Sequence, residues 1–125
     1  MADSFQWAII RTDERVDFRR GKPSLKDLQD AVGGWIEAVP HRHPDFSAFC
    51  NEEGKINGLP LNSVATNFTG IHGDVLVGDV VITGPPDEEG ENTSLPDNVI
   101  ERLSACATGT ALLECALCGP GRSCR

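Results

Sequence analysis

The amino-acid sequence predicts an α+β fold, in which a small, mostly antiparallel sheet is built from hairpins and accompanied by two or three short helices. The first observation is a set of short apolar segments with strand character, at 5–13, 16–20, 35–40, 46–50 and 74–84. The second is a set of segments with helical spacing or capping residues, at 25–32, 63–68 and from 94 onward. The third is their order, which lacks the regular strand–helix alternation of a parallel sheet.

The chain has 125 residues, which suits one domain with a single core. We expect residues 1–107 to form this domain and residues 108–125 to be a cysteine-rich C-terminal tail, whose role the sequence does not show. No apolar run approaches the roughly 18 residues that span a bilayer. The N-terminus lacks the basic and apolar pattern of a signal peptide. We therefore expect a cytoplasmic protein without membrane partners.

The N-terminal third predicts a hairpin followed by a helix. Segments 5–13 and 16–20 are separated by a short polar stretch, which is typical of two paired strands. Ser24 is a good N-cap, and Asp27 three residues later completes a capping box for a helix over 25–32. The two glycines after this helix favour a left-handed C-cap.

The segment NEEGKINGLPLN, residues 51–62, predicts two successive turns. Asn51 and Gly54 occupy the first and fourth positions that a type I turn prefers. After this turn, residues 55–56 are expected to pair back on the preceding strand.

Asn57-Gly58 predicts the second turn, because both residues tolerate positive φ, and Asn62 is expected to cap the helix at 63–68. Every special residue of the segment therefore has a backbone role. Asn57, Gly58 and Asn62 are nevertheless candidates for binding residues, as are Glu88 and Glu89 in the acidic loop that follows residue 84.

The segment 74–84 combines two apolar runs around Gly78-Asp79, which predicts a hairpin with a two-residue type II′ turn. Farther along, Ser94 is expected to cap a helix whose first turn contains Pro96. The apolar residues expected to contribute to the core are Ile9, Leu28, Ile36, Phe49, Leu61, Val75, Val77, Val81, Ile100 and Leu103.

Charge is distributed unevenly along the chain, whose formal net charge is −8. Residues 1–42 hold seven bases and seven acids, whereas residues 43–101 hold one base and eleven acids. Direct nucleic-acid binding is not expected, because it requires clustered Lys and Arg. The acids form either a solvated face or a surface for a basic protein partner, for example a DNA-binding protein. A DNA mimic would need one elongated face with Asp45, Glu52, Glu53, Asp74, Asp79 and the cluster at 87–91.

Four of the five cysteines, Cys106, Cys115, Cys118 and Cys124, lie near the C-terminus. The two-residue spacing of Cys115 and Cys118 lets both thiolates reach one tetrahedral zinc, and the other two could complete the site. The alternative is inert thiols packed as small apolar groups. A redox role is not favoured, because the sequence around these cysteines lacks the βαβ pattern that accompanies redox cysteine pairs. Apart from this zinc hypothesis, we expect no cofactor.

His41 and His43 could face one way in an extended segment near Cys50, which leaves a second transition-metal site as an alternative to a solvated loop. No serine, carboxylate or glycine-rich motif supports a nucleophilic, acid–base or phosphate-binding assignment. The sequence therefore assigns no catalytic residue.

Three motifs resemble a known group of proteins. VGGWIEAV (32–39), NEEGKINGLPLN (51–62) and GDVLVGDVVITG (73–84) occur here in the order and spacing found in small phage, plasmid and bacterial proteins that are grouped as a domain of unknown function. The resemblance covers roughly residues 6–107. It implies a compact α+β domain in a phage or mobile-element context, and it implies no reaction, cofactor or catalytic residue.

Three classes of function follow from these observations. The first is a small non-catalytic accessory protein of phage or mobile-element type that binds another protein. The second is an acidic DNA mimic that inhibits a DNA-binding enzyme. The third is a small-ligand binder or enzyme, which a closed pocket lined by Trp7, Trp35 or Phe49 would favour.

Overall fold

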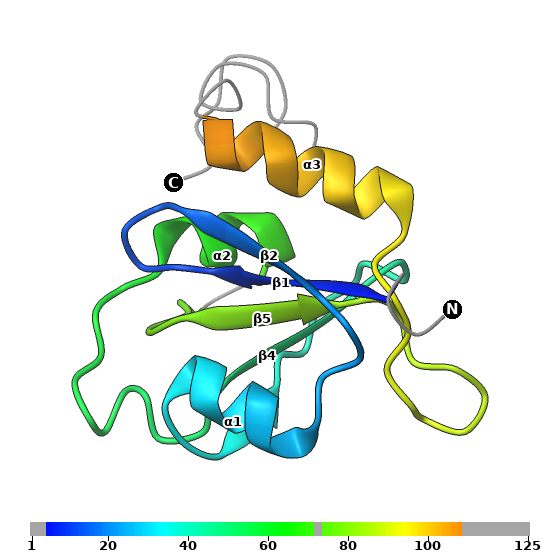
Figure 1. The fold of residues 1–125 in the computed structure, drawn as a ribbon. Coiled ribbons are helices and arrows are strands. Elements are labelled where there is room, and N and C mark those ends of the chain that lie inside the picture. The colour runs from blue at the N-terminus through cyan, green and yellow to red at the C-terminus, as the bar shows by residue number, and fades with distance from the viewer. Residues whose placement is uncertain (1–4, 72–73, 109–125) are drawn as a thin grey trace.

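The computed structural model describes residues 5–71 and 74–108, and it has three layers. A five-stranded antiparallel sheet in the order β2-β1-β5-β4-β3 lies between α1 on one face and α2 and α3 on the other (Figure 1). The strands are β1 (Gln6–Ile10), β2 (Val16–Arg20), β3 (Ile36–Ala38), β4 (Ser47–Asn51) and β5 (Val80–Thr83). The helices are α1 (Leu25–Val32), α2 (Ser63–Thr69) and α3 (Asp97–Thr108). The α+β class is confirmed.

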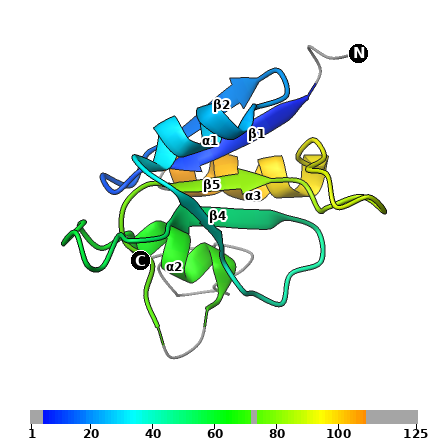
Figure 2. The ribbon, with the colours of Figure 1, turned by 90° about the horizontal axis from the view of Figure 1, so that it is seen from below.

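Two apolar clusters hold the layers together. Ala8 and Ile10 of β1 face α2 and α3, whereas Trp7 and Ile9 face α1, as the alternation of a strand requires. Figure 2 shows α1 lying across its face of the sheet. Because both faces are covered, residues 7–10 are all buried, which explains why the apolar pattern of this strand alternates only imperfectly in the sequence.

The N-terminal hairpin and α1 are confirmed. β1 pairs antiparallel with β2, and α1 spans the expected residues. The Ser24 hydroxyl accepts a hydrogen bond from the Asp27 N–H at 3.1 Å, and the Asp27 carboxylate accepts one from the Ser24 N–H at 2.9 Å. Gly33 closes the helix with φ of 79°.

Within residues 51–62, the turns are confirmed but the pairing of residues 55–56 is wrong. The Gly54 N–H donates to the Asn51 carbonyl at 3.1 Å, and Gly58 has φ of 69°. Residues 55–56 lie inside these turns rather than beside β4. The reason is that the loop closes on itself, since the Leu59 N–H donates to the Gly54 carbonyl at 3.0 Å.

The expected hairpin over 74–84 is wrong. β5 begins only at Val80 and pairs with β1 on one side and β4 on the other. Both of its edges are therefore taken, so the preceding apolar run cannot pair with it. Instead, Val77 forms an isolated antiparallel bridge with Leu61.

The expected N-cap at Ser94 is also wrong, because α3 begins at Asp97. The Ser94 hydroxyl instead accepts a hydrogen bond from the Gln6 N–H at 2.9 Å, and the Leu95 N–H donates to the Gln6 carbonyl at 2.9 Å. This segment thus ties the start of α3 to β1. None of the helices in the described residues is long and apolar enough to span a bilayer.

The core is mostly the expected one. Ile9, Leu28, Val81 and Leu103 are buried. Ile36, Phe49 and Ile100 are partly buried and pack against the two clusters, and Val77 is partly buried. The predictions for Leu61 and Val75 are wrong, because these side chains are 51% and 43% exposed. Leu61 forms the isolated bridge with Val77, and Val75 lies two residues before Val77, so both lie outside the named strands of the sheet.

Candidate interaction surface

One end of the sheet gathers segments that are far apart in the sequence. β1 and β4 end there, and β2, β3 and β5 begin there, so the loops at 11–15, 33–35, 52–62 and 74–79 meet (Figure 1, left). We call these four segments the turn end. The Glu52 N–H donates to the Trp35 carbonyl at 2.9 Å and joins two of them. Parts of all three motifs noted in the sequence therefore lie at this end.

The turn end exposes large apolar side chains. Trp35 is 66% exposed and Ile56 is 84% exposed, and the half-exposed Leu61 and Val75 lie in the same four segments. Only two further large apolar residues are exposed in the described part of the chain, Phe18 and Leu25. Several exposed apolar side chains in one region are typical of an interaction site.

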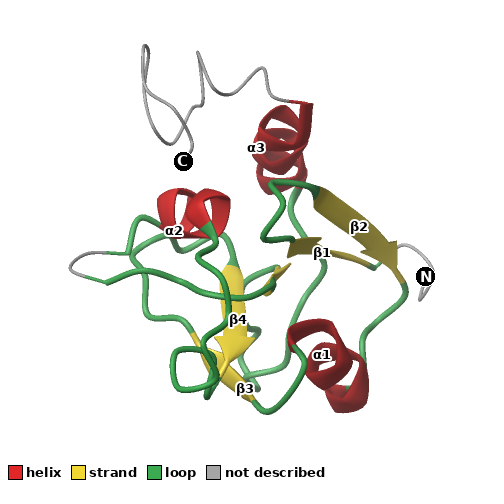
Figure 3. Ribbon diagram, turned by 90° about the vertical axis from the view of Figure 1, so that its left-hand side faces the viewer, coloured by secondary structure: helices red, strands yellow, loops and turns green. Residues whose placement is uncertain are grey.

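A groove with a volume of about 220 Å³ lies beside these side chains. We call it the β3 groove. One wall is formed by β3, β4 and the turn after β4, and the other by the segment before β5; Figure 3 shows β3 at the edge of the sheet beside β4. The lining residues are 37–40, 50–52, 55–56, 71 and 74–77.

The charge of the β3 groove is mainly acidic. Glu37, Glu52 and Asp74 line it together with one base, Lys55, which forms an ion pair with Asp74. This hydrogen-bonded ion pair holds the pKa of the Asp74 carboxyl below its usual value. Glu37 is exposed, so a carboxylate is available to a cationic group in the groove.

Cys50 also lines the groove but is not an activated nucleophile. Burial raises the pKa of its thiol above the ordinary value of 9.0, and the nearby Glu37 carboxylate acts in the same direction. The thiol is therefore protonated at neutral pH, whereas nucleophilic cysteines are thiolates.

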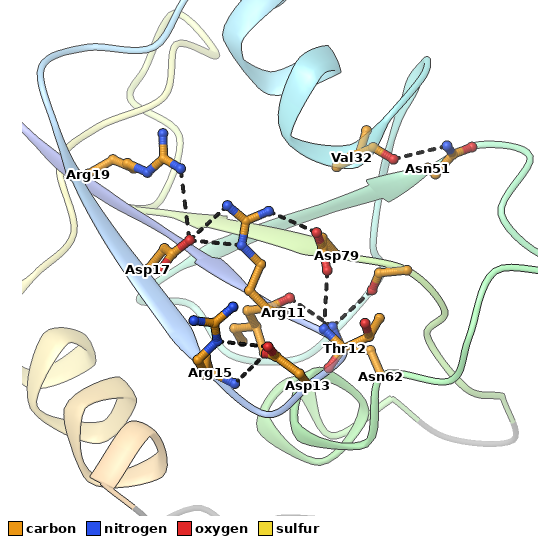
Figure 4. A network of polar contacts seen from close by, with 12 residues as sticks. Arg11, Thr12, Asp13, Arg15, Asp17, Arg19, Val32, Asn51, Asn62 and Asp79 are labelled. Atoms are coloured by element: carbon orange, nitrogen blue, oxygen red, sulfur yellow. Dashed lines mark hydrogen bonds and ion pairs between the residues drawn. The ribbon is translucent and has the colours of Figure 1, made fainter.

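Arg11 organises the other side of the turn end (Figure 4). Its guanidinium donates to Asp17 and to Asp79, each at 2.8 Å, and the Thr12 N–H donates to Asp79 at 3.1 Å. The hydrogen bond to Asp79 is the main reason that the pKa of Arg11 is raised. Because two carboxylates neutralise this cation, the cluster fastens the β1–β2 turn to the turn before β5.

The candidate binding residues are not brought together. Asn62 is fully buried, and its amide donates to the carbonyls of Ile10 and Gly78 at 2.8 and 2.9 Å, so the protein's own backbone occupies it. Asn57 and Gly58 are exposed at the turn end. The other two candidates, Glu88 and Glu89, lie in the loop after β5, at the opposite end of the sheet (Figure 1).

The acids named for a DNA mimic divide between the same two ends. Three of them form ion pairs within the protein: Asp79 with Arg11, Asp74 with Lys55, and Asp45 with the Arg102 guanidinium at 3.4 Å. Asp87 accepts hydrogen bonds within its own loop. This arrangement differs from the single row of free charges that imitates duplex DNA.

His41 and His43 both stack on the ring of Phe46. Their ring centroids lie 4.4 and 5.2 Å from that of Phe46, and the His43 N–H donates to His41 Nδ1 at 3.1 Å. In the described residues, no group of three or more His, Cys, Asp or Glu side chains could hold a metal ion.

The zinc hypothesis rests on residues that are mostly beyond the described range. Cys115, Cys118 and Cys124 lie outside it, whereas Cys106 is buried against the sheet in the last turns of α3. Zinc binding by these four cysteines therefore stays a prediction.

The three aromatic residues that are alternatives for lining a ligand pocket lie in different surroundings. Trp7 is buried against α1 and its indole N–H donates to the Gly21 carbonyl at 3.0 Å. Phe49 packs in the same cluster, whereas Trp35 is exposed. Trp7 lines one cavity and Trp35 lines another, and neither of these two cavities includes Phe49.

Residues 7–107 match the family model described as a domain of unknown function, DUF3846. The chain belongs to this family. The match confirms membership of an uncharacterised domain family over nearly the range expected from the three motifs. No curated protein and no solved structure matches the chain.

Sequence reasoning missed the surface that this DUF3846 domain exposes. The sequence pattern places Trp35 at the start of a strand and predicts that Ile56 pairs back on β4. One signal was present, because Ile56 stands alone among charged and turn-forming residues in EEGKING, and an apolar side chain in such a turn has little core to reach. The β3 groove had no local signal, since its walls come from segments that are distant in the sequence.

Proposed function

We propose that this DUF3846 protein is a non-catalytic accessory protein of phage or mobile-element type that binds a basic segment of another protein at the turn end. The observation that carries the proposal is the exposure of Trp35 and Ile56 at the turn end, where Ile56 also lines the acidic β3 groove. The phage or mobile-element context is supported by the resemblance of the three motifs.

The apolar part of the surface supports a protein partner. Tryptophan is enriched among the residues that contribute most to binding energy, and such residues are most effective when a partner removes them from water. Trp35 and Ile56 are not covered by any described segment of this chain. Burying them in a complex would therefore supply a favourable free energy that the isolated domain does not obtain.

The charged part of the surface supports a basic partner. The chain carries a net charge of −8, and three carboxylates against one amine line the groove. Complementary charge accelerates association and discriminates against acidic competitors. The groove volume of about 220 Å³ is smaller than that of typical ligand pockets, about 300–1,000 Å³, and suits one or two side chains of a peptide.

Affinity capture from a nuclease-treated host lysate tests this function. The bait is the wild-type chain, the double variant Trp35→Ser/Ile56→Ser, or the control Leu25→Ser, which removes an exposed apolar side chain outside the turn end. We expect a stoichiometric protein that the wild type and the control retain, that the double variant loses, and that higher salt releases.

Equal capture by the double variant and the control would contradict the proposal, as would the absence of any stoichiometric partner. The mobile-element part is tested separately by the genes that neighbour this one, which should include phage or plasmid genes.

A further inference from the structure

Strand β3 leaves one side of its backbone unpaired by other strands. It is the last strand of the sheet, and β4 is its only neighbour among the described strands (Figure 3). An antiparallel strand directs the N–H and C=O groups of alternate residues to opposite sides. The Trp35 carbonyl accepts a hydrogen bond from the Glu52 N–H at 2.9 Å, and the Val39 N–H donates to the Ala48 carbonyl at 2.8 Å. Both residues therefore direct their backbone groups toward β4. The N–H and C=O groups of Ile36 and Ala38 therefore point outward.

The β3 groove lies over one face of this edge strand and of β4. Its lining includes the four consecutive residues 37–40. Because successive side chains of a strand point to opposite faces, a groove that touches all four must reach the backbone as well as side chains. On the groove side, the Glu37 carboxylate comes from β3, whereas Ile56 and Val75 supply apolar side chains from the two neighbouring loops.

Proline ends the edge after a short distance. The next residue in the outward series after Ile36 and Ala38 is Pro40, which has no N–H to donate. An added strand can therefore pair only along residues 36–38, which limits its register.

We infer that the protein partner adds a sixth strand to the sheet by pairing an extended segment with β3. The segment places a Lys or Arg beside Glu37 and an apolar side chain two positions away against Ile56 and Val75, because residues two apart share one face of a strand. This inference rests on the proposed function and specifies the partner as an extended chain with the pattern basic–any–apolar.

A second copy of the same chain fits the edge less well. Two β3 strands that paired antiparallel about their middle residue would place Glu37 beside its own counterpart on the same face. Like charges that are directly opposite destabilise a pair of strands. The charge of the edge thus favours a basic partner over self-association.

A displayed library of random linear peptides, selected on the immobilised wild-type chain, tests the inference. We expect the selected peptides to be enriched in Lys or Arg two positions from an apolar residue. Fluorescence anisotropy then compares the affinity of one such peptide for the wild type, for Ala38→Pro and for the control Ala38→Thr. Proline removes an outward N–H without removing a bond between β3 and β4, whereas threonine keeps the N–H.

Ala38→Pro is expected to weaken binding at least about tenfold, and Ala38→Thr to leave it nearly unchanged. Glu37→Gln is expected to weaken binding about threefold and to reduce its dependence on salt. N-methylation of alternate peptide amides provides a test that needs no protein variant: one of the two alternating sets should abolish binding, and the other should be tolerated.

Recovery of no peptide, or equal binding of the peptide by wild type and by a folded Ala38→Pro, would overturn strand addition, as would equal tolerance of both methylated sets. A different result would contradict the proposed function, so the two proposals can be distinguished. If capture of the lysate partner requires Trp35 and Ile56 but is unchanged by Ala38→Pro, the proposed function is supported and only the pairing with β3 is contradicted.

Discussion

Asn62 links three parts of the fold through one side chain. Its side-chain nitrogen donates to the carbonyls of Ile10 at the end of β1 and of Gly78 before β5. Its side-chain oxygen accepts a hydrogen bond from the Ala65 N–H at 3.0 Å, which makes Asn62 the N-cap of α2. The residue is fully buried. All of these partners are backbone groups, which need hydrogen bonds when they are away from water.

Asn62→Ala is expected to lower the free energy of unfolding by about 3 kcal/mol, because it removes a helix cap and leaves buried carbonyls without a donor. Urea denaturation measures this change. The control Asn57→Ala, at an exposed turn position, should change the free energy of unfolding by less than about 0.5 kcal/mol. Similar losses in both variants would show that the buried amide network is not the cause.

His41 should make stability depend on pH. Burial against Phe46, and then the neighbouring His43, hold its pKa below the ordinary value of 6.5, whereas Asp45 acts in the opposite direction. As the pH falls below 6.5, the unfolded chain therefore takes up a proton at this residue before the folded protein does. The stability that His41 provides is present above pH 6.5 and is lost as the pH falls toward the folded pKa.

Thermal unfolding between about pH 7.5 and pH 5 measures this effect. The midpoint of the wild type is expected to fall over this range more steeply than that of His41→Phe, which keeps a ring against Phe46 but does not titrate. Parallel curves for the two proteins would contradict the assignment to His41.

At the scale of elements, the turn that ends near Gly58 depends on one backbone conformation. Gly58 has φ of 69°, and a Cβ built at this position would meet no atom within 4 Å. The cost of a substitution therefore comes from the left-handed conformation and not from a clash.

Gly58→Val is expected to destabilise the protein by about 1–2 kcal/mol, since a β-branched residue adopts this conformation poorly. Gly58→Asn should cost less, because asparagine tolerates the left-handed region. The two variants and the wild type can be compared by thermal unfolding. Melting of Gly58→Val at the wild-type temperature would show that this turn does not need a positive φ.

The elements differ in how far the sequence predicts them. The bounds of α1 follow from Ser24, Asp27 and the glycine after Val32, because capping acts between residues that are at most a few positions apart. The apolar pattern predicts an extended segment at β5 but does not predict the neighbours of this strand. All four of its residues are buried, as expected of a central strand, and an apolar run alone does not say which strands lie beside it.

At the scale of the whole molecule, the order of the strands decides where charge and apolar surface lie. Glu52 and Glu53 follow β4, whereas the acidic loop at 87–91 follows β5, and these strands are antiparallel neighbours. The two acidic groups therefore project from opposite ends of the sheet. The same order brings Trp35, Ile56 and the β3 groove to one end, which is why the proposed binding of a basic segment belongs to that end.

The sequence by itself determined the α+β class, the N-terminal hairpin, the extent of α1, the cap of α2 at Asn62 and the turns within residues 51–62. Each of these depends on hydrogen bonds and backbone preferences over a few residues. The tertiary structure alone decided that β5 lies between β1 and β4, that Ser94 bonds to Gln6, and that Leu61 and Val75 are exposed. Pairing, burial and the β3 groove depend on contacts between distant segments, and a local pattern carries no record of which segments will meet.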